Sequence, residues 1–178
     1  MPARASRCLV IDASVARASG GEDATYPTSK RCRDFLTAVH RICHRVVMTP
    51  EIGREWKEHQ SNFARQWRVS MQARRKVCRV DVTPNDMLYD KVKQEAANDK
   101  AHQAMLNDLH LIEAALITDR TVVSLDESAR GLFAEMAERV GELKNVSWVN
   151  PDRVDEQPIR WLEEGARPEK NRWLGSGA

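Results

Sequence analysis

Short apolar runs alternate along the chain with longer stretches that have the character of helices. Continuous apolar runs are typical of strands that are buried on both faces of a parallel sheet. They predict strands at 8–11, 46–48, 121–126 and 145–150. Helical spacing of apolar residues and helix start signals together predict helices at 31–45, 51–76, 108–117 and 127–141. This alternation predicts an α/β fold with a central, mainly parallel sheet that is flanked by helices.

Two Thr-Pro pairs mark expected helix starts. Thr49 is placed as an N-cap, with Pro50 at the first helical position, and the same pair recurs at 83–84. The intervening segment 77–82, VCRVDV, is consistent with a short strand or with the exit from the preceding helix. We expect one core domain that covers residues 1–150 and contains an additional helical segment at about 60–105.

The composition is that of one ordinary globular domain, and the charge is nearly balanced. Of 178 residues, 42% are apolar and 30% are charged, and the formal net charge is +2. No apolar run approaches the roughly 20 residues of a membrane span, and the first run is too short for a secretory signal. We therefore expect a cytoplasmic protein with no membrane partner and with free thiols, Cys8 being a small core residue. The tail 151–178 is expected to be partly disordered.

Several acidic residues are expected near the edge of the sheet at which the parallel strands end. Asp12 and Asp126 each end a predicted strand, and ligands of such sheets bind at the carboxyl ends of the strands. Glu55 lies one turn into the helix after strand 46–48. Asp108 is expected to open the helix 108–117, where the helix dipole favours a carboxylate. We call Asp12, Glu55, Asp108 and Asp126 the acidic quartet.

Each member of the acidic quartet also has a simpler interpretation. The aspartates suit helix caps, turns or helix-start positions. Glu51 and Glu58 lie on nearby faces of the same helix as Glu55, and any of the three can be a solvated charge. If the four acids converge, however, their repulsion calls for a cation. Mg²⁺ or Mn²⁺ suits such oxygen ligands, with Asp12, Asp108 and Asp126 as metal ligands and Glu55 as a ligand directly or through water.

The ordered motifs resemble those of a known family. VIDAS around Asp12, TPEIGREW around Glu55, NDLHLIEAAL around Asp108 and VVSLD around Asp126 resemble the four acidic motifs of PIN-domain ribonucleases over residues 8 to about 150. The resemblance implies a PIN-like α/β/α sandwich and metal-dependent cleavage of RNA. Members of this family often act as homodimers, and many bacterial members are toxins that a protein antitoxin holds inactive, so the resemblance makes both a homodimer and an antitoxin partner possible expectations here.

A stretch without acids follows the second predicted strand. Between His59 and Val80 lie basic residues with Phe63 and Trp67 interleaved one helical turn apart. Such a pattern suits a phosphate backbone with stacked bases, and equally a solvated helix face with Trp67 in the core. The nucleic-acid-binding candidates are Arg65, Arg68, Arg74, Arg75 and Lys76.

The sequence gives weaker evidence for other sites and functions. His40 and His44 are spaced to share a zinc ion, with Cys43 nearby, but a structural site wants four converging ligands. A phosphatase of the haloacid-dehalogenase type needs a second Asp where Ser14 stands, and a response-regulator receiver usually has an acidic pair before its phosphorylated Asp. The leading hypothesis is a metal-dependent endoribonuclease, and the alternative is a catalytically inactive PIN-like scaffold that binds RNA or protein.

Overall fold

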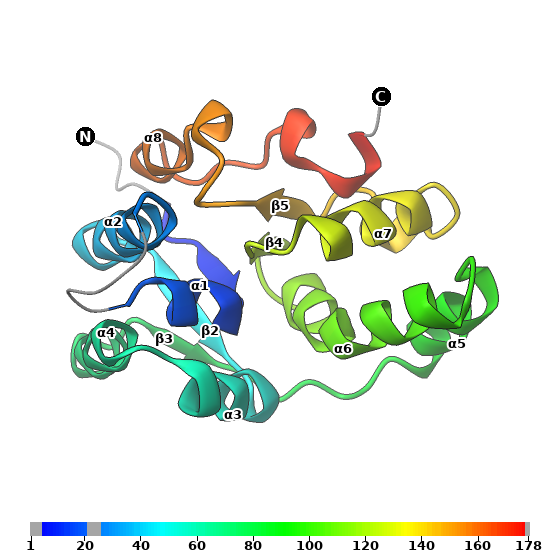
Figure 1. Cartoon of the computed structure of the whole chain (residues 1–178), viewed down its shortest axis with the longest axis horizontal. Helices are drawn as coiled ribbons and strands as arrows, with labels where there is room; N and C mark the ends of the chain where they lie inside the picture. The colour runs from blue at the N-terminus through cyan, green and yellow to red at the C-terminus, as the bar shows by residue number, and fades with distance from the viewer. Residues whose placement is uncertain (1–4, 21–25, 177–178) are drawn as a thin grey trace.

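The protein is built on a parallel sheet of five strands, in the order β3-β2-β1-β4-β5 (Figure 1). The structure is a computed structural model that describes residues 5–20 and 26–176. Every pair of neighbouring strands in this sheet is parallel, which confirms the α/β class and the mainly parallel sheet. The strands are β1 (Cys8–Ile11), β2 (Arg45–Met48), β3 (Val77–Arg79), β4 (Thr121–Val123) and β5 (Ser147–Val149).

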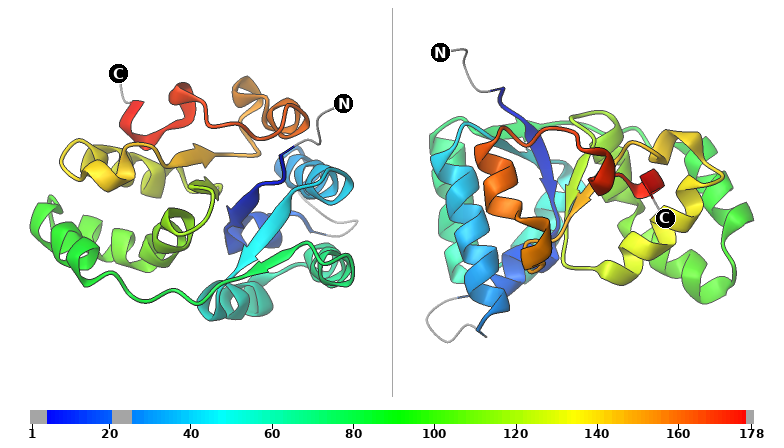
Figure 2. Two further views of the ribbon diagram at one scale, coloured as in Figure 1. Left: turned by 180° about the vertical axis from the view of Figure 1, so that it is seen from behind. Right: turned by 90° about the horizontal axis from the view of Figure 1, so that it is seen from above.

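Helices cover both faces of the sheet, as an α/β/α sandwich requires. In Figures 1 and 2, α1 to α4 and α8 gather on one side of the strands, and α5, α6 and α7 gather on the other. The helices of the described residues are α1 (Ala13–Ala18), α2 (Thr28–Arg41), α3 (Pro50–His59), α4 (Asn62–Ala73), α5 (Asp86–Glu95), α6 (Asp99–Leu116), α7 (Glu127–Ala137) and α8 (Pro158–Glu163). None of these helices is long and apolar enough to span a membrane.

The central strand β1 shows why the apolar runs are continuous. Leu9, Val10 and Ile11 have no exposed surface, because helices cover both faces to which their side chains point. The register pairs Leu9 with Val46 of β2 and Ile11 with Val123 of β4. Strands β1, β2 and β4 therefore end at one edge of the sheet, and the segments after them start there.

The expected helix over 51–76 is wrong in its continuity. The chain forms α3 up to His59, breaks, and starts α4 at Asn62. Ser61 makes the break because its side chain accepts a hydrogen bond from the backbone N–H of Ala64, the contact of an N-cap. The start of α3 is as expected, with the Thr49 side chain accepting from the N–H of Ile52.

The expectations for the next two helices need correction as well. The Thr-Pro pair at 83–84 does not start α5, because the side chain of Asn85 caps that helix. Asn98 caps α6, which begins at Asp99. Asp108 therefore lies inside a helix and does not open one, so it has no favourable interaction with the helix dipole.

A disulfide joins Cys8 of β1 to Cys78 of β3, with 6.4 Å between their Cα atoms. The expectation of free thiols is thus wrong for this pair. Cys8 does lie in the core as expected, but it is cross-linked there. The bond connects two segments that are 70 residues apart in the sequence.

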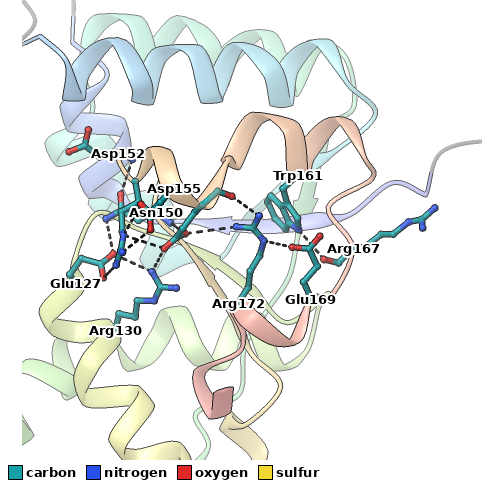
Figure 3. Close-up of polar contacts among 11 residues, drawn as sticks. Glu127, Arg130, Asn150, Asp152, Asp155, Trp161, Arg167, Glu169 and Arg172 are labelled. Atoms are coloured by element: carbon teal, nitrogen blue, oxygen red, sulfur yellow. Dashed lines mark hydrogen bonds and ion pairs between the residues drawn. The ribbon is translucent and has the colours of Figure 1, made fainter. Parts of the chain in front are cut away.

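The described part of the tail packs against the domain. Trp161 and Leu162 of α8 are buried, as is Leu174. Figure 3 shows Arg172 between Trp161 and Glu169: its Nε donates to Glu169 at 2.7 Å, and its guanidinium carbon lies 5.3 Å from the centre of the Trp161 ring.

The tail also reaches the outer side of β5. Trp173 forms an antiparallel bridge with Ser147, and the backbone N–H of Leu174 donates to the carbonyl of Val146 at 2.9 Å. Gly175 packs so closely on Lys144 that an added Cβ would lie 2.9 Å from the Cα of Lys144.

Candidate active site

Two members of the acidic quartet follow neighbouring strands at the carboxyl edge of the sheet. Asp12 comes directly after β1, and its backbone N–H donates to the carbonyl of Val123, the last residue of β4, at 2.9 Å. Asp126 lies three residues after Val123. Pairing between β1 and β4 thus holds the two segments together where the strands end.

The Asp12 carboxylate is held by two hydroxyl groups. Its Oδ2 accepts hydrogen bonds from Ser14 Oγ at 2.5 Å and from Ser124 Oγ at 2.9 Å. No hydrogen bond within the described residues uses Oδ1 of Asp12. The two serines fix the plane of the carboxylate and leave one of its oxygens available for a ligand.

Asp126 has the cap role that its simpler interpretation gave it. Its Oδ1 accepts from the backbone N–H of Ala129 at 2.8 Å, which makes Asp126 the N-cap of α7. Its own N–H donates to Ser124 Oγ at 3.1 Å. Capping occupies one carboxylate oxygen and orients the other, so it is compatible with a role in the site.

Glu55 is distinguished from Glu51 and Glu58 by a partner on another helix, since among the described residues those two pair only with residues of α3 itself. His110 Nε2 lies 2.9 Å from Oε2 of Glu55, and His110 is buried. Glu51 and Glu58 are both exposed. Of the three acids, Glu55 is therefore the one that is held against α6, the helix that also carries Asp108.

Asp108 reports on the position of the other three acids. Burial, and after it the negative charges of Asp12, Asp126 and Glu55, together raise the pKa of Asp108 to about 7, while His110 opposes the shift. The interaction between like charges weakens as the distance between them grows. Asp12, Glu55 and Asp126, from three separate elements, therefore lie close enough to Asp108 on α6 to shift its pKa.

The donor chemistry of this site fits a hard divalent cation. All four groups are carboxylates, and the raised pKa of Asp108 indicates that His110 offsets only part of their mutual repulsion. Within the described residues, however, no group of three or more His, Cys, Asp or Glu side chains is arranged as a ready metal-binding cluster. Among the described residues, the four acids therefore interact electrostatically without forming a ready metal-binding cluster.

His110 is the site residue that sequence reasoning missed. It stands two positions after Asp108, in the motif NDLHLIEAAL, and points to Glu55 from a buried position. A histidine on the otherwise apolar face of the helix was the available signal. That signal is weak, because buried histidines more often satisfy a core hydrogen bond.

The basic stretch divides into residues with different surroundings. Arg65, Arg74 and Arg75 are exposed. Lys76 is engaged in hydrogen bonds within the protein, because its Nζ donates to the backbone carbonyls of His40 (2.7 Å) and Ile42. Arg68 is half-buried and lines a pocket with the start of α3 and the ends of β2 and β3.

The aromatic residues of this stretch belong to the interior. Trp67 is buried, donates its indole N–H to the carbonyl of Leu36 at 2.6 Å, and stacks on Trp56 with ring centres 5.7 Å apart. Phe63 lies under the guanidinium of Arg33, 5.6 Å from its ring centre. Trp67 is therefore a core residue and offers no face to a base.

The residues of the alternative zinc cluster have separate partners. His40 Nε2 lies 2.7 Å from Ser70 Oγ, and His44 Nε2 lies 2.9 Å from the carbonyl of Leu162. The Cys43 sulfur is 3.9 Å from the carbonyl of Ala5. These contacts tie α2 and the following loop to α4, to the tail and to the N-terminal segment.

Comparison of the chain with protein-family models gives no match, and comparison with curated proteins gives none either.

Proposed function

We propose that this protein is a metal-dependent endoribonuclease whose active site is the acidic quartet. The observation that carries the proposal is the pKa of Asp108, which is raised to about 7 by burial and by the charges of Asp12, Asp126 and Glu55. Four carboxylates that act on one another with only His110 to offset their charge are costly, and a site that binds a divalent cation explains their presence.

Asp12, Asp108 and Asp126 would hold Mg²⁺ or Mn²⁺, with Glu55 as a further ligand directly or through water. Such an ion supplies a polarised phosphoryl oxygen and a bound water of lowered pKa. The chain itself contributes orientation. Ser14 and Ser124 fix Asp12, the cap of α7 fixes Asp126, and His110 fixes Glu55. A toxin role with a protein antitoxin, and a homodimer, remain predictions of the family resemblance alone.

The test is cleavage of a labelled single-stranded RNA with Mn²⁺ or Mg²⁺, compared with EDTA and with Asp12→Asn. Glu55→Gln and Glu58→Gln form a matched pair, because both remove one charge from α3 but only Glu55 contacts His110. We expect cleavage that needs the metal, Asp12 and Glu55, and that survives Glu58→Gln.

Metal binding is measured separately, as the Mn²⁺-induced rise in melting temperature, which should shrink in Asp12→Asn and Asp108→Asn. Cleavage that persists in Asp12→Asn would point to a contaminating nuclease. Binding of RNA and metal without turnover would favour the scaffold alternative.

A further inference from the structure

A pocket of about 460 Å³ lies between the start of α3, the helix α4 and the ends of β2 and β3. Its lining includes Thr49 and Gly53 from the α3 segment and Gln72 from α4. Arg68 and Arg79 line it from α4 and from the end of β3, and Asp81 is the one acid among its lining residues. The lining therefore carries a net positive charge.

The two arginines of the pocket lack ionic partners. Among the described residues, no ion pair within 4.0 Å includes Arg68 or Arg79, whereas about half of the other described arginines have one. Arg68 donates only to the backbone carbonyl of Gly53, at a long 3.4 Å. Burial and the positive charge of Arg79 hold the pKa of Arg68 below its ordinary value. Two like charges that line one pocket, neither of them in an ion pair with its one acid, Asp81, favour an anion.

The pocket opens at the same edge of the sheet as the acidic quartet. Met48 ends β2 and lines the pocket, and Asp12 follows β1, the strand that pairs with β2. Helix α3 lies between the two places, because Gly53 lines the pocket and Glu55, two positions later and so on roughly the opposite side of the helix, faces His110. A nuclease whose acids repel the phosphates of its substrate needs positive charge close by to hold the strand.

The space over Gly53 is open. A Cβ added at this position would meet no heavy atom within 4 Å, so the space over this part of α3 is empty. A large side chain at 53 would occupy that space without disturbing the packing of the helix.

We propose that the pocket between Arg68 and Arg79 binds a phosphate group of the RNA strand, beside the site of cleavage. This inference rests on the proposed function, which supplies the substrate, and it names the group that holds the substrate in register. The phosphate is either an internal phosphodiester or the 5′-terminal phosphate of the strand, and the two arginines recognise the same chemistry in both.

The test uses the full chain with Asp12→Asn in EDTA, so that binding is measured without turnover. The probes are 3′-labelled eight-nucleotide RNAs that differ only in a 5′-hydroxyl or a 5′-phosphate, followed by fluorescence anisotropy over a salt series. Arg68→Met and Arg79→Met should each weaken binding by about tenfold and lower the salt slope by about 0.7. Arg160→Met is the control for net charge, because Arg160 is exposed on α8 and pairs with Glu164. It should change binding by less than about twofold.

A steric pair gives a second readout. Gly53→Leu should weaken binding, whereas Gly131→Leu, at a glycine of α7 that also has nothing within 4 Å of its added Cβ, should not. Melting temperatures establish that each variant is folded. A loss confined to the 5′-phosphate probe assigns the pocket to the strand end, and equal losses on both probes assign it to an internal phosphodiester.

Two results would overturn the inference: full affinity in Arg68→Met and Arg79→Met, or an equal loss in Arg65→Met, which would indicate a diffuse basic surface. Failure of the proposed function would give a different result: no metal-dependent cleavage would be observed, and the comparison of RNA binding between the variants would still be valid.

Discussion

His110 and Glu55 meet across the candidate active site, with 2.9 Å between Nε2 and Oε2, although 55 residues separate them in the sequence. The contact joins α6 to α3 and so holds Glu55 in place. Asp12 and Asp126 are positioned by the strands they follow, and Asp108 lies on α6 itself. The side chain of His110 is 8% exposed and that of Glu55 is 33% exposed, so the pair spans from the interior to the site.

We expect His110→Ala to lower metal affinity and cleavage by on the order of 10- to 100-fold, the usual effect of removing the partner of a ligand. His110→Gln, whose amide can still donate to Glu55, should restore a large part of both. Mn²⁺ titration and RNA cleavage measure the two effects. Equal losses in the Ala and Gln variants would show that His110 acts through packing and does not position Glu55.

The raised pKa of Asp108 makes stability depend on pH. The folded state holds the proton up to about pH 7, whereas an unfolded aspartate loses it near the ordinary pKa of 3.8. Between these values the folded state binds more protons, so the free energy of unfolding falls as pH rises and stays low above pH 7.

In EDTA, Asp108→Asn should therefore be more stable than the unaltered protein by about 2 kcal/mol at pH 8, allowing for the partial exposure of the side chain. The gain should shrink toward pH 4. Urea unfolding at several pH values measures it, with Asp90→Asn on the exposed face of α5 as control. A gain independent of pH would contradict the assignment.

The Cys8–Cys78 disulfide should contribute substantially to stability, because it closes a loop with a sequence separation of 70. We expect reduction by dithiothreitol, or Cys78→Ser, to lower the free energy of unfolding by about 2–4 kcal/mol. Dithiothreitol should have no further effect on Cys78→Ser. Cys43→Ser is the control, since exposed Cys43 takes no part in the disulfide. Urea curves that are unchanged by reduction would show that the bond does not form in solution.

Three glycines respond in opposite directions to alanine. Gly53→Ala and Gly131→Ala place a methyl group in open space inside a helix, so each should stabilise the protein by about 0.5–1 kcal/mol. Gly175→Ala should destabilise it, because the new Cβ would lie 2.9 Å from backbone atoms of Lys144. Thermal unfolding of the three variants measures the difference, and a stabilising Gly175→Ala would mean that the tail is not docked.

Much of the fold follows from local patterns, and the errors lie where local patterns are ambiguous. The apolar runs predict the strands because both faces of the sheet are buried. The break at Ser61 was missed because a serine inside an amphipathic stretch is also compatible with a continuous helix. The early start of α6 was missed because Asn98 resembles a turn until its side chain is seen to cap the helix.

The acids of the site could be predicted from the sequence, but the contacts that hold them in place could not. Asp12 and Asp126 could be placed from strand ends alone, since parallel strands bring their carboxyl ends together. The contact between His110 and Glu55 depends on how α6 packs against α3, which no local pattern encodes. The same holds for Lys76 and Trp67, whose polar atoms are satisfied by the carbonyls of α2 and the residue after it.

The bridge between Trp173 and Ser147 has a consequence for how molecules of this protein meet. Beta strand β5 stands last in the strand order, and the tail occupies backbone groups beside it that another chain would otherwise pair with. Loss of the segment after Glu169, by proteolysis or by a stop codon, would uncover that row of donors and acceptors. The shortened protein would be prone to aggregation through strand pairing between copies, even with its catalytic edge intact.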